Sequence, residues 1–282
     1  MARLRWLHRI EELDPVADHE EIYRISAGYE FPWDYQRALE LALFRTYCVP
    51  SISALLAATG EFRDRPQRRY DDTALLMAEL AAHGYDSPRG KEALRVVNRM
   101  HGRYAISNDD MRYVQSTFVV IPMRWLDRFG WRPLTETERR ASANYYRELG
   151  RHMNIKDSPA TYQEFAAYLD AYERAHFAYS PGGRAVSDST LALLTSFSPR
   201  PLRPLMRRLT LALLDPPLRE AFRYPRPDPV TRALVVGGLG ARAVVERRLP
   251  PRREPRFVHD LPEFAIYPDG YDIGQLGTFP RP

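Results

Sequence analysis

The 282-residue chain lacks several features that mark common protein classes. It contains one cysteine, Cys48, so it cannot form an internal disulfide, which favours a reducing compartment and a cytoplasmic location. Its apolar runs, such as Thr117–Pro122 and Ala233–Leu239, are far shorter than the roughly 20 residues that cross a bilayer. The N-terminus has no apolar stretch of signal-peptide length. These absences predict a soluble protein without a transmembrane segment.

Most motifs of common enzyme classes are absent as well. The chain has no G-x-S-x-G, no H-E-x-x-H and no phosphate-binding loop. A single E-x-x-H runs from Glu173 to His176, whereas a carboxylate-bridged di-iron bundle needs two such motifs and two further glutamates. The glycines of Val236–Gly240 lack the third glycine and the preceding strand of a dinucleotide site, and indicate close helix packing instead.

The charge balance is mildly basic. The net charge is +5, from 41 basic and 36 acidic residues, and most of the basic residues are arginines. No nucleic-acid-binding module accompanies them, so we expect no nucleic-acid partner. Two basic clusters, Arg63–Arg69 and Arg200–Arg256, have two interpretations. In the first interpretation both clusters are solvated surface. In the second they contact anions: Arg63–Arg69 binds the anionic groups of a bound ligand, and Arg200–Arg256 contacts a peripheral membrane surface or an acidic partner.

The apolar spacing predicts an all-α protein of about ten helices. Strand-like alternation is absent, and helical periodicity with capping residues recurs along the chain. Residues 1–18 read as an exposed lead-in, and Ser180–Arg184 as a loop. We expect one helical domain over residues 1–247, followed by an irregular, proline-rich tail over residues 248–282 that packs on the surface. The expected helices cover residues 34–47, 51–58, 70–83, 88–104, 109–129, 135–150, 161–177, 187–194, 201–214 and 229–247.

Two of these helices, residues 70–83 and 88–104, carry the candidate site. His101 lies in the apolar stripe of the second helix, with Leu94 and Val97. A histidine in this setting is either a buried core residue or a metal ligand. A haem needs one side-chain ligand to iron, apolar walls, and cations for its propionates, and the neighbouring sequence offers all three.

Three further residues accompany the histidine. Arg69 and Thr73 are four positions apart and share a helical face, with Asp72 beside them. Arg69 and Asp72 either form an ordinary surface pair at a helix start or face the same cofactor as His101. Asn98 precedes His101 by one turn, from where its amide would contact the cofactor edge.

The order of several short motifs resembles the rubber oxygenase (latex clearing protein) and MpaB family. R-x-x-D-T at Arg69–Thr73 is followed by N-R-M-H-G at Asn98–Gly102. Ser107–Phe118, Gly130–Leu134 and Gly150–Ile155 then fit the MpaB branch in particular. The resemblance covers the chain from about Tyr29 to Phe177 and is carried by the spacing of the motifs together.

The resemblance implies a globin-like helical fold that holds one non-covalent haem b per chain. Members use dioxygen to cleave carbon–carbon double bonds in isoprenoid chains. The family's proximal histidine corresponds to His101, and its arginine and threonine on the facing helix correspond to Arg69 and Thr73. Rubber oxygenases have a lysine where this chain has Asp72, which implies an open sixth site with a carboxylate nearby.

The expected function is therefore a haem b-dependent oxygenase that uses dioxygen on an apolar small molecule in secondary metabolism. Oxidative cleavage of a double bond in an isoprenoid or polyketide is the simplest form. Asp72, Arg69 and Thr73 are the candidate catalytic residues, with Asp72 as acid or base. His101, Arg69, Thr73 and Asn98 are the candidate cofactor-binding residues. The alternatives are hydroxylation, oxidative coupling or peroxide chemistry on the same haem, or a helical haem-binding protein that is no enzyme.

Overall fold

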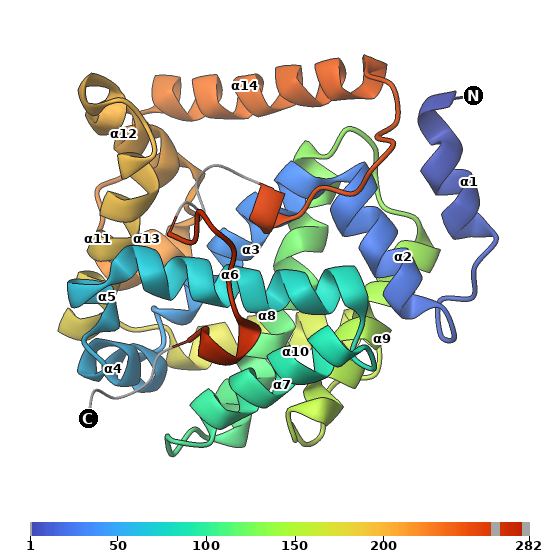
Figure 1. The fold of residues 1–282 in the computed structure, drawn as a ribbon. Coiled ribbons are helices and arrows are strands. Elements are labelled where there is room, and N and C mark those ends of the chain that lie inside the picture. Colours follow the sequence, from blue (N-terminus) through green and yellow to red (C-terminus); the bar gives the residue numbers. More distant parts are fainter. Residues whose placement is uncertain (1, 261–265, 278–282) are drawn as a thin grey trace.

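The computed structural model describes residues 2–260 and 266–277 (Figure 1). Every regular element in these ranges is helical, with fourteen α-helices and no strand. The all-α class is therefore confirmed. The number of helices exceeds the expected ten because several short helices join the predicted ones.

The helices follow one another with short connections. The first half of the chain forms α1 (Arg5–Glu11), α2 (His19–Ile25), α3 (Pro32–Thr46), α4 (Pro50–Ala58), α5 (Glu61–Asp64), α6 (Pro66–His83) and α7 (Pro88–His101). The second half forms α8 (Asn108–Phe129), α9 (Glu136–His152), α10 (Tyr162–His176), α11 (Pro181–Ser196), α12 (Arg203–Leu213), α13 (Pro216–Phe222) and α14 (Pro229–Arg248). Short 3₁₀ or π turns lie at η1 (Ala2–Leu4), η2 (Ser26–Glu30), η3 (Arg200–Leu202), η4 (Val258–Asp260) and η5 (Ile273–Gln275).

Helix α8 is the centre of the fold. It begins after Ser107, whose hydroxyl accepts a hydrogen bond from the backbone N–H of Asp110. Its side chains are buried on several sides, including Tyr113, Val120 and Met123. Helices α3, α9 and α10 pack around it. An apolar helix surrounded by other helices confirms the prediction of a central, buried element over residues 109–129.

Two predictions about connections were wrong. Residues 1–18 contain helix α1, which buries Ile10 against α2 and α9. The expected loop at Ser180–Arg184 is the first turn of α11, because the Ser180 hydroxyl accepts from the N–H of Gly183 and Pro181 takes the first helical position. Serine, proline and glycine favour loops, and the same residues also begin helices.

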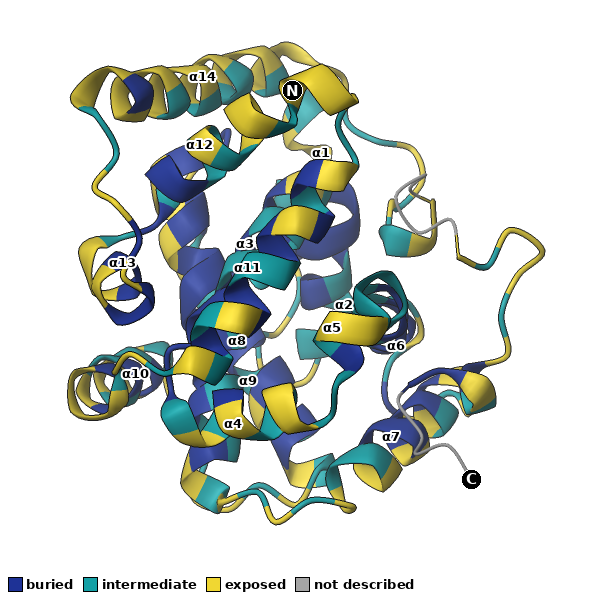
Figure 2. Cartoon of the chain, turned by 90° about the vertical axis from the view of Figure 1, so that its left-hand side faces the viewer, coloured by how far each residue is buried: buried dark blue, intermediate teal, exposed yellow. Residues whose placement is uncertain are grey.

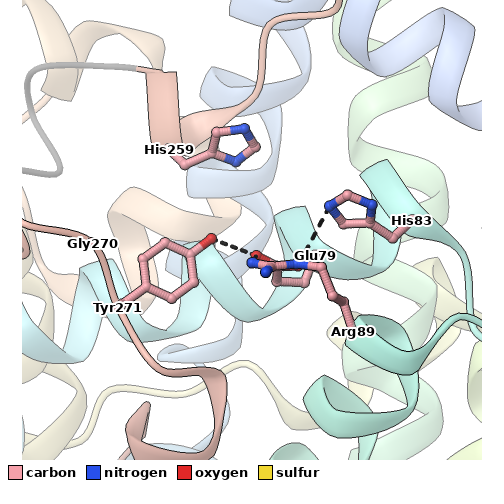
Figure 3. A pocket seen from close by; sticks show the side chains of 6 residues that line it. All are labelled: Glu79, His83, Arg89, His259, Gly270 and Tyr271. Atoms are coloured by element: carbon pink, nitrogen blue, oxygen red, sulfur yellow. Dashed lines mark hydrogen bonds and ion pairs between the residues drawn. The ribbon is translucent and has the colours of Figure 1, made fainter.

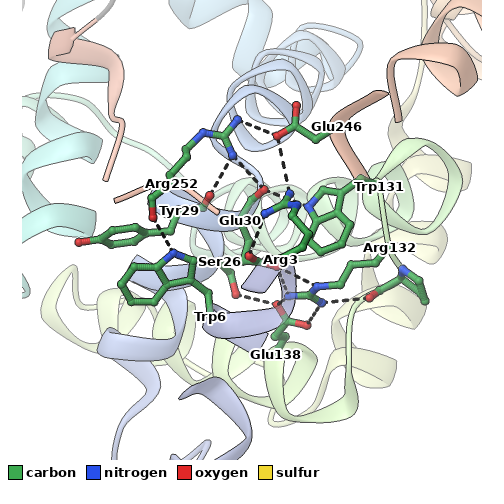
Figure 4. Close-up of polar contacts among 11 residues, drawn as sticks. Arg3, Trp6, Ser26, Tyr29, Glu30, Trp131, Arg132, Glu138, Glu246 and Arg252 are labelled. Atoms are coloured by element: carbon green, nitrogen blue, oxygen red, sulfur yellow. Dashed lines mark hydrogen bonds and ion pairs between the residues drawn. The ribbon is translucent and has the colours of Figure 1, made fainter. Parts of the chain in front are cut away.

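A buried network of charges joins both ends of the described chain to its middle (Figure 4). The Arg132 guanidinium contacts the carboxylates of Glu30 and Glu138 at 2.9 and 2.7 Å. Arg252 donates to Glu246 at 2.7 Å and to the backbone carbonyl of Tyr29 at 2.9 Å. Burial raises the pKa of Glu30, and Arg132 opposes that shift. The motif Gly130–Leu134 that pointed to a family thus has a structural role in this network.

The segment after α14 crosses the outer side of α6 and ends beside α7 (Figure 1). Its only regular elements among the described residues are η4 and η5, as expected for an irregular tail that packs on the surface. Residues 261–265 and 278–282 of this expected tail lie outside the described residues. No single described helix has the length and apolar character needed to cross a membrane, although α3 and α4, bent by 97°, meet those criteria as a pair.

Candidate functional site

Helix α6 carries three of the predicted site residues. Pro66 takes its first position, and Gly84 ends it with a φ of 76°, which the other amino acids adopt at a steric cost. Within the helix, the Arg69 guanidinium donates to the hydroxyl of Thr73, and that hydroxyl donates in turn to the Arg69 carbonyl at 2.9 Å. The predicted shared face of Arg69 and Thr73 is therefore a direct contact.

Helix α7 packs against α6 and ends at His101. The Ser87 hydroxyl caps its start by accepting from the N–H of Gly90 at 2.9 Å. The His101 side chain is half-buried, and its Nδ1 atom is buried without a hydrogen-bond partner among the described residues. Such a nitrogen is free to accept or donate a hydrogen bond, or to ligate a metal.

The electrostatics of His101 favour the neutral imidazole. Burial, and to a smaller extent the positive charge of Arg69, together lower its pKa to about 4. Helices α6 and α7 pack against each other, which places Arg69 near enough for its charge to act on the His101 ring. At neutral pH the imidazole carries no charge, and the neutral form is the one that ligates metals.

Aromatic rings border this pair. The Arg69 guanidinium lies over the ring of Phe62, 5.5 Å from its centroid. Phe62 in turn packs edge-on against Tyr47, with centroids 5.5 Å apart. Behind His101 in α7, Leu94 and Val97 belong to the main hydrophobic core. Arg69 therefore lies against an aromatic side chain of α5, while apolar residues of the helix that carries His101 belong to the main core.

The structure gives Asp72 a different set of contacts. Its side chain is 2% exposed. The phenol of Tyr267 donates to Oδ1 at 2.6 Å, and the backbone N–H of Gly277 donates to Oδ2 at 2.9 Å. Arg68 lies 3.5 Å from the same Oδ2 atom. Both carboxylate oxygens are thus engaged by the tail and by α6 itself.

Asn98 is exposed on α7, and its contact points toward α9. Its side-chain amide donates to the backbone carbonyl of His152, at the end of α9, at 2.9 Å. The structure therefore brings together Arg69, Thr73 and His101, while Asp72 and Asn98 are held by other segments.

The E-x-x-H motif of α10 has a separate role. Glu173 is buried and accepts from Arg45 Nε at 2.7 Å, while Arg45 Nη1 reaches Asp215 at 2.5 Å. The Tyr113 phenol donates to Glu173 at 3.3 Å. His176 is exposed, stacks on the ring of Tyr172 with centroids 4.0 Å apart, and bonds to the Tyr172 carbonyl within its own helix. The described residues contain no group of three side chains able to hold a bare metal ion, so the di-iron interpretation has no support.

A pocket of about 320 Å³ lies between α6, the start of α7 and the tail (Figure 3). Arg89 forms a two-pronged ion pair with Glu79 at 2.6 and 2.7 Å, and Tyr271 donates to the same carboxylate at 2.5 Å. His83 and His259 complete its polar walls. Sequence reasoning missed this pocket, because its lining residues come from two helices and from a distant, irregular tail.

Comparison with known proteins identifies the family of the chain. A family model described as "ER-bound oxygenase mpaB/B'/Rubber oxygenase, catalytic domain" matches residues 36–247. The chain belongs to this family. Arg69, Thr73 and His101 lie inside the matched region, and the tail residues that hold Asp72 lie beyond it. The resemblance expected from the sequence motifs is therefore confirmed.

Three members of the MpaB and rubber oxygenase family show the extent of the likeness. The ER-bound oxygenase mpaB' of Penicillium brevicompactum is 30% identical over 264 residues, which cover 86% of this chain and 62% of that protein. The mpaB of Penicillium roqueforti (strain FM164) is 29% identical over 235 residues, 76% of this chain and 78% of that protein. The mpaB of Penicillium brevicompactum is 29% identical over 243 residues, 75% of this chain and 62% of that protein. The match thus spans 62%, less than two thirds, of the length of each of the two Penicillium brevicompactum relatives.

Proposed function

We propose that this protein is a haem b-dependent oxygenase that acts on an apolar small molecule. The observation that carries the proposal is the imidazole of His101. It is neutral at physiological pH, has a buried nitrogen without a described partner, and lies beside a cation in a family of oxygenases. One such histidine is enough for a haem, because the porphyrin supplies the other ligands to iron.

The types of residue near Arg69 and His101 support a haem b. Arg69 offers a positive charge for an anionic propionate, and Phe62 beside Arg69 and Leu94 and Val97 before His101 offer apolar surface. Haem supplies, when bound, the dioxygen chemistry that protein side chains lack. The protein contributes the position of the cofactor, the exclusion of water and the local charge.

Each predicted residue then has a proposed task. His101 holds the cofactor from α7. Arg69 orients an anionic group, and its hydrogen bond with Thr73 limits the rotamers of the guanidinium. A proton-transfer role for Asp72 stays a prediction, and its bonds to the tail suggest a second role in shaping the site. The cofactor contact of Asn98 also stays a prediction, since its amide is engaged with α9.

The proposed substrate is an isoprenoid or polyketide with a carbon–carbon double bond. All three relatives are named as oxygenases, and the aliphatic side chains of α7 near His101 favour an apolar ligand. Hydroxylation, oxidative coupling and peroxide chemistry would use the same site. Product analysis therefore has to distinguish them from cleavage of the double bond.

The absorption spectrum tests the cofactor. Protein expressed with haem supplementation is expected to show a Soret band, and extraction into pyridine to give the spectrum of haem b. His101→Ala should abolish haem retention, while His176→Ala, at an exposed position of α10, should leave it unchanged. A colourless wild-type protein, or a full Soret band in His101→Ala, would overturn the assignment.

Product analysis tests the reaction. Isoprenoid alcohols with internal double bonds are incubated with the haem-loaded protein under labelled dioxygen. Cleavage gives aldehyde or ketone ends that carry the label, whereas hydroxylation keeps the carbon chain whole. Turnover that needs peroxide and ignores dioxygen would contradict the oxygenase proposal and leave the haem assignment intact.

A further inference from the structure

Helix α14 lies on the outside of the molecule (Figure 2), and two charged side chains in its second half contact the rest of the protein. Arg242 forms an ion pair with the buried Asp34 at 2.5 Å and lies over the ring of Trp33. One turn later, Glu246 pairs with Arg252 at 2.7 Å. Thr231 is the one fully buried residue of this helix. The charged side chains in its second half thus anchor α14 to the protein.

The outward face of α14 is apolar. Val230, Leu234, Val244 and Val245 recur at helical spacing and are 69, 66, 49 and 58% exposed. The nine residues 233–241 carry no charged side chain. An ordinary surface helix of a water-soluble protein has the opposite arrangement, with apolar side chains inward and charges outward.

Helix α12 extends this apolar surface. It packs against α14, and Leu202, Leu205 and Met206, at its start, are exposed. The α12–α14 surface is defined here by Leu202, Leu205, Met206, Val230, Leu234, Val244, Val245 and Leu249. Exposed apolar side chains gathered on two helices that pack together indicate an interaction site.

Arginines border the α12–α14 surface and indicate which partner it takes. Arg232 and Arg248 are exposed near the two ends of α14, and Arg253 and Arg256 are exposed in the segment that follows. A second copy of the chain would bring two such basic borders together, which like-charge repulsion opposes. An anionic lipid surface satisfies both features, because it accepts apolar side chains between its headgroups and attracts the arginines around them.

We propose that the α12–α14 surface docks this protein on anionic membranes, with α14 lying flat in the headgroup region. The protein binds the membrane peripherally: the apolar side chains insert between the headgroups, and the arginines contact the anionic headgroups. It depends neither on haem nor on the proposed reaction. A position at the bilayer surface would place an oxygenase where apolar molecules concentrate.

Sedimentation with lipid vesicles tests the proposal on the full chain. The wild-type protein is expected to sediment with vesicles that contain phosphatidylserine, and much less with phosphatidylcholine alone. Leu234→Glu places a charge on the outward face and should weaken partitioning on the order of tenfold or more. Val16→Glu makes the same change at an exposed valine in the turn between α1 and α2, and should have no effect.

A second variant separates charge from apolar contact. Arg232→Gln combined with Arg248→Gln should reduce the preference for phosphatidylserine while keeping the circular dichroism spectrum and melting temperature of the wild type. A wild-type chain that stays in the supernatant with both vesicles would overturn the proposal. So would a Leu234→Glu variant that binds vesicles normally, or one whose sole change is dissociation of a dimer in light scattering.

Discussion

The phenol of Tyr267 donates a 2.6 Å hydrogen bond to the carboxylate of Asp72 across 195 positions of the chain. The second oxygen of Asp72 accepts from the backbone of Gly277. A carboxylate that was predicted to act in chemistry is therefore also the attachment point of the tail. The pKa of the Tyr267 phenol is raised to about 12, first by burial and then by Asp72, so the phenol remains a donor at physiological pH.

Variants at this contact distinguish the two roles of Asp72. Tyr267→Phe removes one hydrogen bond to a charged group and should lower the free energy of unfolding by about 1.5–3 kcal/mol in urea denaturation. It should also speed proteolytic cleavage of the tail. Tyr179→Phe, at an exposed tyrosine, serves as the control and should change neither.

Activity then decides between attachment and proton transfer. If Asp72 moves a proton, Asp72→Asn should lose turnover with wild-type haem content, while Tyr267→Phe keeps it. Equal losses in both variants would assign Asp72 to attachment of the tail alone.

The neighbouring Asp71 predicts a pH dependence of stability. Burial, together with the charge of Asp72, raises the pKa of Asp71 to about 6, against a hydrogen bond from Gln67 that lowers it. The folded state thus holds a proton that the unfolded chain releases near pH 4. The contribution of Asp71 to the free energy of unfolding is fully present below about pH 4. It is lost as the pH rises through 6, and the decrease is roughly 2 kcal/mol. Asp71→Asn should remove that decline in urea titrations at pH 5 and 7.5, whereas exposed Asp86→Asn should not.

The ion pair of Arg45 and Glu173 predicts a large loss of stability. Glu173→Ala leaves the buried guanidinium of Arg45 without its main partner and should lower the free energy of unfolding by about 3–5 kcal/mol. The pair of Arg124 and Asp170 provides the comparison, because both of its side chains are exposed. Asp170→Ala should cost less than about 1 kcal/mol. Similar losses in the two variants would contradict the importance of burial.

Gly90 fixes the approach of α7 to α6. A Cβ atom added at Gly90 would lie 1.8 Å from the carbonyl oxygen of Gly84, which is backbone and has to move. Gly90→Ala should therefore cost about 1–3 kcal/mol and, by shifting α7, loosen the pairing of Arg69 with His101 and reduce haem retention. Gly237→Ala in α14 meets nothing within 4 Å and should be neutral or stabilise by about 0.5–1 kcal/mol. Thermal melting and the Soret intensity measure the two effects.

Local signals allowed much of the fold to be predicted. The predicted bounds of α8 and α9 are close to those observed because serine, threonine and glutamate caps and helical periodicity stand in the sequence itself. The contact of Arg69 with Thr73 followed from their four-residue spacing in the same way. The approach of Arg69 to His101 was expected from a family resemblance, since spacing within one helix cannot report a contact between two.

Long-range contacts could not be predicted from the sequence. The role predicted for Asp72 stays a prediction, but its bonds to Tyr267 and Gly277 were not foreseen, since these partners lie in an irregular tail without periodicity. Asn98 bonds to a backbone carbonyl of α9, and a carbonyl leaves no trace in the amino-acid sequence. The inward charges of α14 were equally hidden, because Asp34 and Arg242 are far apart along the chain.

The network that joins the two ends of the described chain also bears on the order of folding. The Trp6 indole donates to the carbonyl of Arg252 across 246 positions, and Arg132 holds Glu30 in the same region. Contacts that close such long loops form late, because chain entropy opposes them until the intervening helices have packed. On a translating ribosome, Glu30 and Arg132 emerge long before Arg252. The charged interior of this region is therefore completed only after Arg252 has been synthesised, whereas α3 and α8, which pack extensively on each other, are available earlier.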